Sequence, residues 1–311
     1  MQVLFSIVLP IFALIGVGWL ARHRGWMGAA GAVEMNRFVV YLGMPALLFQ
    51  IMAKSSWKQL DQPAFIAAFG LASAAVYALT VAVRRLRGGE LADASLEGLN
   101  AAYANVGFIG FPLSMAAFGP ASMMPATIAA ILTVCVLFGV AITVVELGVN
   151  EGAGIGRILL KVGASLARNP MLLAPAAGAL YAGVAPPLPE GADRFLSLLA
   201  HAASPCALVS LGLFIADQRG RPPVPALSAQ VALKLVGQPL LTWLLADHVF
   251  HLSPAMTGLA VVLAALPTGT GPFMLASMYR REAGGIAGSI LVSTVLSVLT
   301  ISVLVTWFRT T

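Results

Sequence analysis

Apolar runs of about twenty residues recur along the whole chain, and they constrain its fold more than any other feature of the sequence. An α-helix of that length spans the ~30 Å hydrocarbon core of a bilayer. Hydrophobic residues make up 59% of the 311 residues and charged residues only 10%, which leaves little sequence for a domain outside the membrane. The sequence therefore predicts an all-α polytopic membrane protein with ten transmembrane helices, over residues 3–21, 34–53, 63–83, 95–119, 122–147, 157–183, 195–216, 224–247, 254–279 and 284–308.

Basic residues are distributed unevenly between the loops that join these segments. The loops on one side hold 13 lysine and arginine residues, whereas those on the opposite side hold 4. Because Lys and Arg collect in cytoplasmic loops, the first set is predicted to be cytoplasmic and both termini to lie on the opposite side of the membrane. The net charge of +6 then reflects topology and requires no nucleic-acid partner. The first segment lacks a basic stretch before it and a cleavage pattern after it, so we expect a retained span and not a signal peptide.

Several prolines of the first half are followed by a second proline at one fixed distance along the sequence, and this constant offset predicts an internal structural repeat. Four of the six prolines in the first half have a partner at this offset: Pro10 and Pro170, Pro45 and Pro205, Pro63 and Pro223, Pro112 and Pro272. Chance would produce about one match or fewer. We therefore expect two five-helix repeats, residues 1–150 and 151–311. Because each repeat has an odd number of spans, the two cross the membrane in opposite senses, like the inverted repeats of secondary transporters.

Two predicted spans, the fourth and the ninth, contain residues that interrupt a helix. The interruptions lie in NAAYANVGFIGFPLSMAAFG, residues 100–119, and ALPTGTGPFMLASMY, residues 265–279, at equivalent positions of the two repeats. A break inside hydrocarbon is tolerated only where protein or a polar cavity surrounds the backbone. Asn105 lies about 18 Å along the helix from Asp93, near the bilayer midplane. We therefore expect broken crossover helices that form a transporter's central binding site.

The two breaks favour an anionic ligand without a buried charge of their own. Pro112 and Pro272 suit the first turn of a new half-helix, because the missing proline N–H would have no partner there. Two helix N-termini would then present N–H donors and partial positive charge to one crossing. Asn105 adds an amide, and Thr268 and Thr270 add hydroxyls. The predicted substrate-binding residues are Asn105, Gly107, Gly110, Pro112, Pro267, Thr268, Gly269, Thr270, Gly271, Pro272, Lys234, Gln238, Pro45 and Pro205.

Lys234 is the basic residue predicted to lie inside a span, near the middle of the segment between Pro223 and Asp247. An ammonium at that depth is costly on a lipid-facing surface, so it should face protein or water. Two interpretations remain open. The side chain is either a counter-charge for an anionic substrate or a proton-linked site, or its stem snorkels to the membrane surface. Gln238 lies one turn further on and shares its helix face.

Several other residues in the spans have plainer interpretations. Pro45 and Pro205 are predicted to kink the second and seventh spans, and the sequence leaves open whether they line the pocket. At Pro175 and Pro239 we expect kinks alone. His201 lies beside the bend of the seventh span, where we expect a structural hydrogen bond.

Three motifs resemble the auxin efflux carrier family, which includes bacterial carboxylate carriers and the plant auxin carriers. They are AYANVGFIGFPL around Asn105, ALPTGTGPFMLASMY with its closing Tyr279, and ARNPMLLAPAAG, which ends at Gly178. The resemblance covers essentially the whole chain. It implies a scaffold of helices 1, 2, 6 and 7, a transport domain of helices 3–5 and 8–10, and a substrate carboxylate held at the crossing by Asn105. Only about ten residues separate the fifth and sixth spans. The resemblance therefore favours the bacterial branch, with a malonate- or malate-type carrier that works by alternating access. It implies a bacterial inner membrane with both termini periplasmic.

Other functional classes match the sequence less well. Sodium-coupled bile-acid symporters share the broken helices but need acidic or carbonyl-rich ion sites, and Glu97 and Glu146 lie near span ends. An intramembrane enzyme would need a nucleophile and base, or paired aspartates, at membrane depth, and no GxGD or GxSG motif is present. A receptor or scaffold would leave the repeat unexplained. Cys135 and Cys206 have no CxxC spacing, so we expect no disulfide, metal or cofactor. Transport direction, coupling ion and assembly into a homodimer are left open.

Overall fold

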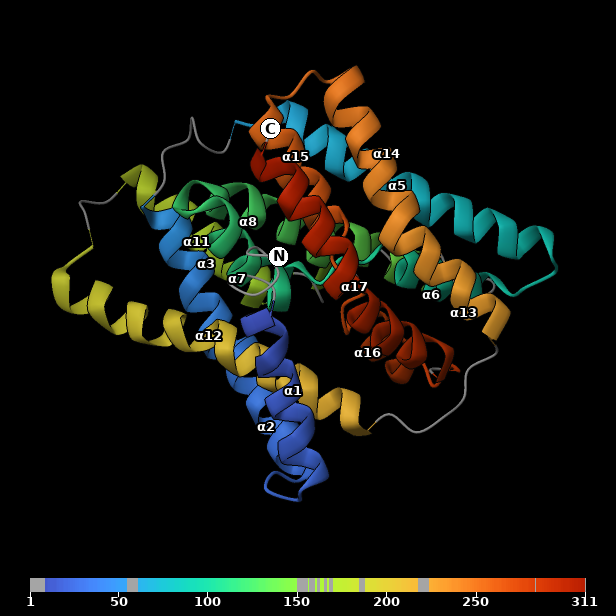
Figure 1. The fold of residues 1–311 in the computed structure, drawn as a ribbon, viewed down its shortest axis with the longest axis horizontal. Helices are drawn as coiled ribbons and strands as arrows, with labels where there is room; N and C mark the ends of the chain where they lie inside the picture. Colours follow the sequence, from blue (N-terminus) through green and yellow to red (C-terminus); the bar gives the residue numbers. More distant parts are fainter. Residues whose placement is uncertain are drawn as a thin grey trace. The chain divides into compact units, whose positions relative to one another are not determined.

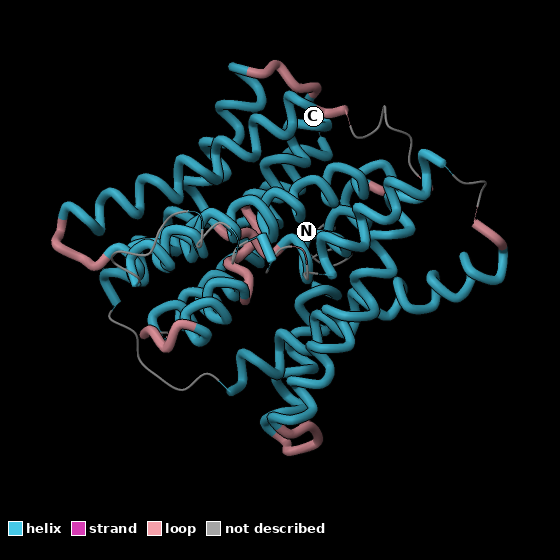
Figure 2. The backbone as a smooth tube through the Cα atoms, turned by 180° about the vertical axis from the view of Figure 1, so that it is seen from behind, coloured by secondary structure: helices cyan, strands magenta, loops and turns pink. Residues whose placement is uncertain are grey.

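The computed structural model describes residues 9–54, 61–149, 156, 160, 163–164, 167, 170–184, 188–217, 224–282 and 284–310. Pro223 and the start of the sixth predicted span lie outside these residues. Within them the secondary structure is helical apart from one isolated β-bridge (Figure 2). Six of the described helices are long and apolar enough to cross a membrane: Ala29–Ala53, Pro63–Leu86, Pro120–Val149, Glu190–Asp217, Leu227–Val249 and Gly284–Phe308. The all-α polytopic class predicted from the apolar runs is confirmed.

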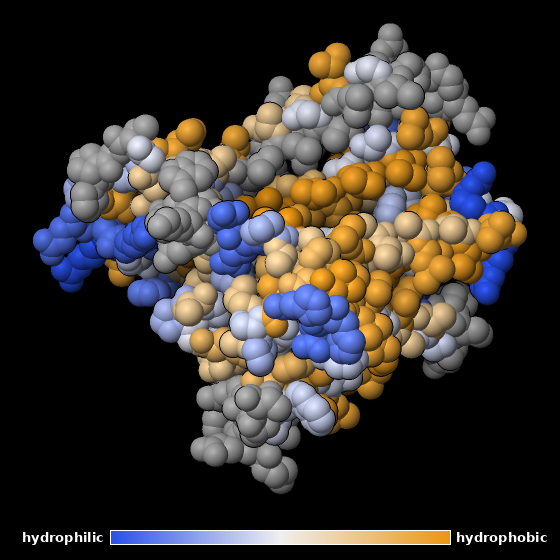
Figure 3. Space-filling view, turned by 90° about the horizontal axis from the view of Figure 1, so that it is seen from above, coloured by the Kyte–Doolittle hydropathy of each residue, from blue (hydrophilic) through white to orange (hydrophobic). Residues whose placement is uncertain are grey.

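Hydrophobic side chains cover much of the surface that faces the viewer in Figure 3, and hydrophilic side chains gather in separate patches. Many large apolar residues are exposed on the long helices, among them Leu79, Leu299 and Val303, which are 56%, 64% and 66% exposed. A soluble protein rarely presents so much contiguous apolar surface. This surface is the one that a lipid environment requires.

The chain divides into two compact units. Unit 1 comprises Met1–Pro63, Gly107–Ile128 and Arg168–Asp217, and unit 2 comprises Ala64–Val106, Ala129–Ala167 and Gln218–Thr311. The helices of unit 1 are α1 (Leu9–His23), α2 (Ala29–Phe38), η2 (Val39–Gly43), α3 (Met44–Ala53), α7 (Phe111–Phe118), η4 (Pro120–Ser122), α11 (Pro170–Val184) and α12 (Glu190–Asp217). Three of the described helices cross the boundary between the units: η3 (Val106–Gly110), α8 (Met123–Ile131), and α5 (Pro63–Leu86), whose first residue, Pro63, belongs to unit 1. The helices of unit 2 are α5 (Pro63–Leu86), α6 (Leu91–Ala102), η5 (Leu132–Leu137), α9 (Phe138–Val149), α13 (Val224–Ala232), η6 (Leu233–Gly237), α14 (Gln238–Trp243), η7 (Leu244–Val249), α15 (Pro254–Ala264), α16 (Gly271–Met278) and α17 (Gly284–Thr310).

One pair of helices, α7 and α16, recurs at the same offset as the prolines. Both ends of α7 and α16 are related by the offset that relates Pro112 to Pro272. This one pair of helices follows the sequence repeat.

Two close helix contacts in unit 1 are made by residues that the proline offset relates to each other. α1 packs on α12 where a Cβ atom at Gly18 would clash with the Val209 carbonyl oxygen (Figure 1). α11 packs on α3 where a Cβ atom at Gly178 would lie 2.5 Å from the Phe49 carbonyl oxygen. The proline offset relates Gly18 to Gly178, and it also relates Phe49 to Val209. Small residues let membrane helices approach closely, so unit 1 contains two equivalent helix pairs.

Three of the span prolines follow a wide helical turn instead of breaking the helix. Each lies two residues after a π-helical segment: Pro45 after η2, Pro112 after η3 and Pro239 after η6. A π turn re-routes backbone hydrogen bonds, so it can accommodate the absent proline N–H. The prediction that Pro112 begins a half-helix is therefore wrong, because a continuous helix runs over Val106–Phe118. Pro272, in contrast, is the second residue of α16 and lies in its first turn.

Candidate functional site

Two helix breaks lie against each other in unit 2. α6 ends at Ala102 before a helix begins at Val106, and α15 ends at Ala264 before α16 begins. The exposed backbone of one break pairs with that of the other through an antiparallel bridge between Ala104 and Thr268. The Asn105 N–H donates to the Pro267 carbonyl oxygen at 2.9 Å, and the Gly269 N–H to the Tyr103 carbonyl oxygen at 3.1 Å. This pairing satisfies groups that neither helix can satisfy inside a membrane.

Side chains around the two breaks are deeply buried. Asn105 is 4% exposed and Thr268 is 1% exposed. The Thr268 hydroxyl donates to the Asn100 carbonyl oxygen at 3.1 Å, and the Thr268 N–H donates to Ser293 Oγ, also at 3.1 Å. Thr268 therefore links the second break to α6 and to α17.

Tyr103 explains the glycines of the second break. Its ring packs against the backbone so closely that a Cβ atom at Gly269 would lie 2.9 Å from the ring, and one at Gly271 would lie 2.6 Å from it. Phe138 lies on the ring as an edge-to-face neighbour, with centroids 6.1 Å apart. Sequence reasoning missed Tyr103, although an aromatic residue two positions before Asn105 was a visible signal.

Gly271→Ala is expected to destabilise unit 2 by about 1–3 kcal/mol, because overpacking forces the buried Tyr103 ring to move. Thermal unfolding of the purified protein in detergent measures the loss. Gly285→Ala is the matched control, since no atom lies within 4 Å of a Cβ atom there. An unfolding temperature for Gly271→Ala equal to that of the control would contradict the role assigned to the Tyr103 ring.

Lys234 and Gln238 cap the ends of both helices that stop at the breaks. Both side chains are fully buried. Lys234 Nζ donates to the carbonyl oxygen of Ala264, the last residue of α15, at 2.6 Å and to Gln238 Oε1 at 2.7 Å. Gln238 Nε2 donates to the carbonyl oxygen of Ala102, the last residue of α6, at 3.1 Å and to Ser73 Oγ at 3.0 Å. The Lys234 side chain therefore does not snorkel, and its ammonium lies at a negative helix end.

A second polar group lies on the same face of this helix. Gln230 precedes Lys234 by four residues, and its Oε1 accepts from Asn100 Nδ2 at 2.5 Å and from Ser289 Oγ at 3.2 Å. Asn100 is 1% exposed, and its carbonyl oxygen already binds Thr268. Sequence reasoning missed Asn100 and Gln230, although amides within apolar segments were a signal. The breaks are thus enclosed by buried polar groups in an apolar unit.

Several acidic side chains of unit 2 bind a tyrosine or an arginine side chain. Tyr279 Oη donates to Glu146, which is 2% exposed. Arg281 binds Glu90 at 2.7 Å and Asp93 at 3.4 Å, and the Glu90 hydrogen bond raises the pKa of the guanidinium above its ordinary range. Among the described residues no three His, Cys, Asp or Glu side chains gather as they would around a metal ion.

The structure separates the predicted site residues between the two units. Unit 2 holds Asn105, Pro267, Thr268, Gly269, Thr270, Gly271, Pro272, Lys234 and Gln238. Unit 1 holds Gly107, Gly110, Pro112, Pro45 and Pro205. Pro45 lies in α3 and Pro205 inside the uninterrupted α12, close to the point where Gly43 of η2 approaches Ala203 of α12. His201 is exposed on α12.

Comparison with known proteins supplies the context for this site. The sequence profile of a family described as membrane transport protein matches residues 3–305. A Rhizobium meliloti protein, provisionally named a malonate transporter, is 30% identical over 301 residues, which cover 96% of this chain and 93% of its own length. An uncharacterized transporter of Methanocaldococcus jannaschii is 22% identical over 310 residues, 96% of each chain. The uncharacterized transporter YfdV of Escherichia coli K12 is 24% identical over 284 residues, 88% of this chain and 87% of its own.

Proposed function

Because the chain belongs to the membrane transport protein family, the family of the auxin efflux carriers that its motifs resemble, we propose that it carries small carboxylates across the bacterial inner membrane. Membership makes the chain an integral membrane transporter and not an enzyme. The observation that carries the carboxylate proposal is the pairing of two helix breaks in unit 2, each followed directly by a new helix. The name of the Rhizobium meliloti relative supports malonate as the first substrate to test.

The charges of the helix ends account for anion binding. Four helix ends occur at the paired breaks: the C-terminal ends of α6 and α15, and the N-terminal ends of the helices that begin at Val106 and Gly271. Each C-terminal end carries about −0.5 charge and each N-terminal end about +0.5, so the four would cancel. The Lys234 ammonium and the Gln238 amide compensate the C-terminal ends. The N-terminal ends then dominate with about one positive charge, which suits one carboxylate.

In this proposal Asn105 and Thr270 bind the substrate carboxylate. Asn105 directly precedes the helix that begins at Val106, and Thr270 directly precedes α16. Their amide and hydroxyl groups would add hydrogen bonds at the two positive helix ends. Lys234 acts through the end of α15 without touching the substrate.

Alternating access would use unit 2 as the transport domain and unit 1 as the scaffold. The division of the chain supports this, because α1, α2, α3, α11 and α12 belong to unit 1 while α5, α6, α9 and α13 to α17 belong to unit 2. Gly107–Ile128, which the motif resemblance assigns to the transport domain, groups with unit 1 instead. The equivalent glycine contacts of unit 1 support the inverted repeat.

Both termini are expected to face the periplasm, because the 13 and 4 basic residues of the two loop sets follow the positive-inside rule. Fusions of alkaline phosphatase and of a cytoplasmic fluorescent reporter to the C-terminus test this orientation. Phosphatase activity without fluorescence is the expected result. The reverse pattern would contradict the topology and the inversion of the repeats.

Uptake of radiolabelled malonate into proteoliposomes tests the transport function. We expect saturable uptake that unlabelled malonate or malate inhibits and that a neutral diamide of the same size does not. Protein-free liposomes are the control, and a preset proton or sodium gradient identifies the coupling ion. Equal uptake with and without protein, for a panel of mono- and dicarboxylates, would refute the carboxylate proposal while leaving the family assignment intact.

A further inference from the structure

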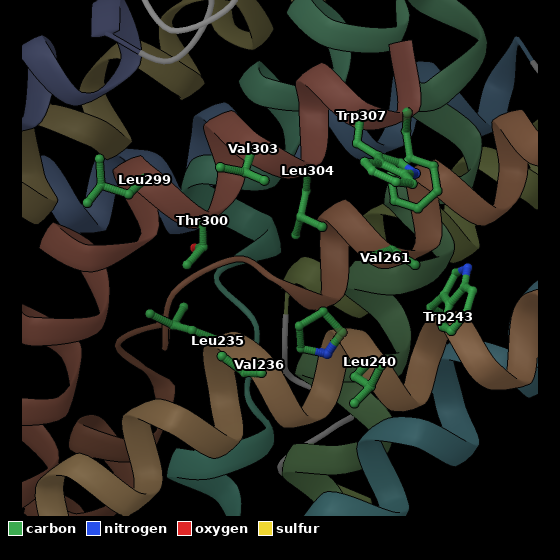
Figure 4. A pocket seen from close by; sticks show the side chains of 12 residues that line it. Leu235, Val236, Leu240, Trp243, Val261, Leu299, Thr300, Val303, Leu304 and Trp307 are labelled. Atoms are coloured by element: carbon green, nitrogen blue, oxygen red, sulfur yellow. The ribbon is translucent and has the colours of Figure 1, made fainter. Parts of the chain in front are cut away.

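An apolar groove runs along the outside of unit 2, away from the polar groups at the breaks. It has a volume of about 560 Å³. Figure 4 shows its two walls: Leu299, Val303, Leu304 and Trp307 come from α17, and Leu235, Val236, Leu240 and Trp243 come from η6 and α14, with Val261 of α15 between them. Val261 and Leu235 are only 2% and 5% exposed, whereas the outer residues Val303 and Leu240 are 66% and 52% exposed. The groove therefore has a buried floor and open rims.

The lining carries few polar groups. Of the residues that form the groove, only Thr300 carries a hydroxyl, and Trp243 and Trp307 carry indole N–H groups. The Thr300 hydroxyl donates to the Ser297 carbonyl oxygen in its own helix at 3.4 Å. An occupant of the middle of the groove must be hydrocarbon, because a polar group there would lose its hydrogen bonds to water. In an integral membrane protein the medium at exposed apolar helices is lipid.

The length and volume of the groove match a single hydrocarbon chain. From Leu299 to Phe308 the groove follows α17 for about 13.5 Å, close to the ~15 Å depth of one leaflet. A transmembrane helix of that length and ~10 Å diameter needs roughly 1,000 Å³, so it cannot lie wholly inside the groove, as a single hydrocarbon chain can. A water molecule, similar in size to a methylene group, takes up about 30 Å³, and the groove thus accommodates roughly 18 methylene groups. That is one fatty-acyl tail.

The two tryptophans define the direction of the tail. Figure 4 shows Trp243 and Trp307 at the same end of the groove, near the C-terminal ends of α14 and α17. Tryptophan prefers the headgroup level of a bilayer, where its ring is apolar and its N–H is hydrated. We propose that this groove is a binding site for one acyl tail of a membrane phospholipid, whose headgroup lies at the Trp243 and Trp307 end.

Quenching of tryptophan fluorescence by brominated phospholipids tests the proposal. In the test protein, the substitutions Trp19→Phe, Trp26→Phe and Trp57→Phe leave Trp243 and Trp307 as the only fluorescent tryptophans. Phosphatidylethanolamine with dibrominated tails is then titrated into the detergent-solubilised protein. We expect quenching that saturates near one lipid per protein. Bromines at carbons 4 and 5 should quench more than bromines at carbons 11 and 12, because the indoles lie at the headgroup end.

Variants that fill the groove identify the site. Val303→Phe and Leu240→Phe, on opposite walls, should each weaken saturable quenching at least tenfold. The matched control is Val295→Phe on α17, which is 61% exposed and lies outside the groove. Non-saturating quenching that is equal in all three variants would mean ordinary lipid contact and would overturn the proposal. A change of oligomeric state caused by Val303→Phe but not by Val295→Phe, with quenching unaltered, would overturn it in favour of a second copy.

Discussion

Lys234→Met is expected to destabilise the protein, by about 1–3 kcal/mol for each buried acceptor that loses its donor, and to abolish most carboxylate uptake. The substitution keeps an apolar stem but leaves two acceptors, the carbonyl oxygen of Ala264 and Oε1 of Gln238, without the ammonium. It also restores the negative end of α15 next to the proposed anion site. Thermal unfolding in detergent and uptake into proteoliposomes measure the two effects separately.

Lys54→Met is the control for this substitution, because Lys54 is half exposed and binds Asp193 at 2.6 Å in a surface ion pair. Such pairs contribute about 0–1 kcal/mol. A double-mutant cycle with Gln238→Leu should give a coupling energy of about 0.5–3 kcal/mol, since the two side chains act as one cap. Wild-type stability of Lys234→Met would show that the cap is unnecessary, and wild-type uptake would refute its electrostatic role.

The contacts of Lys234 illustrate what the sequence alone could not provide. Mid-span depth predicted that its charge needs a partner, but a lysine can meet that need with a substrate, a carboxylate or the membrane surface. One partner is a backbone carbonyl at the end of another helix, and backbone carbonyls leave no trace in composition or spacing. The sequence predicts that Lys234→Met impairs transport more than folding, whereas the contacts require a substantial effect on folding as well.

Repeats and helix ends were predictable to different degrees. The proline offset relates the bounds of α7 to those of α16, because proline restricts backbone geometry wherever it occurs, while the full five-helix repeat stays a prediction. The same residue misled the assignment of the first half-helix. Pro112 is compatible both with a helix start and with a π turn before it, and only packing decides between these.

Glycines that leave room for a neighbouring side chain were the hardest residues to interpret from the sequence. Gly269 and Gly271 were expected to bend the chain and form a site, yet the Tyr103 ring also requires both positions to lack a side chain. The ring and the two glycines belong to different halves of the sequence. Without knowledge of which break faces which, no pattern within either motif reveals their contact.

Asn105→Ala is expected to weaken carboxylate binding by roughly 10- to 100-fold, because a hydrogen bond to a charged group contributes about 1.5–3 kcal/mol. Asn105 lies where its backbone already pairs with Pro267 and where a new helix begins at the next residue. The position directly before a helix favours Asn, so a smaller loss of stability of about 1 kcal/mol should accompany the change. Binding is measured with purified protein by isothermal titration calorimetry, uptake in proteoliposomes, and stability by thermal unfolding.

Asn100→Ala provides the matched control, since it removes the same amide group from the last turn of α6, where Asn100 Nδ2 binds Gln230. It should lower stability while changing carboxylate affinity little. Asn105→Asp should bind more weakly than Asn105→Ala, because a carboxylate at this position repels the anion in addition to removing the donor. If Asn105→Ala folds and binds malonate with wild-type affinity, while Asn100→Ala loses it, the carboxylate site lies on the Gln230 side of the breaks. Asn105 would then only stabilise the start of the second helix.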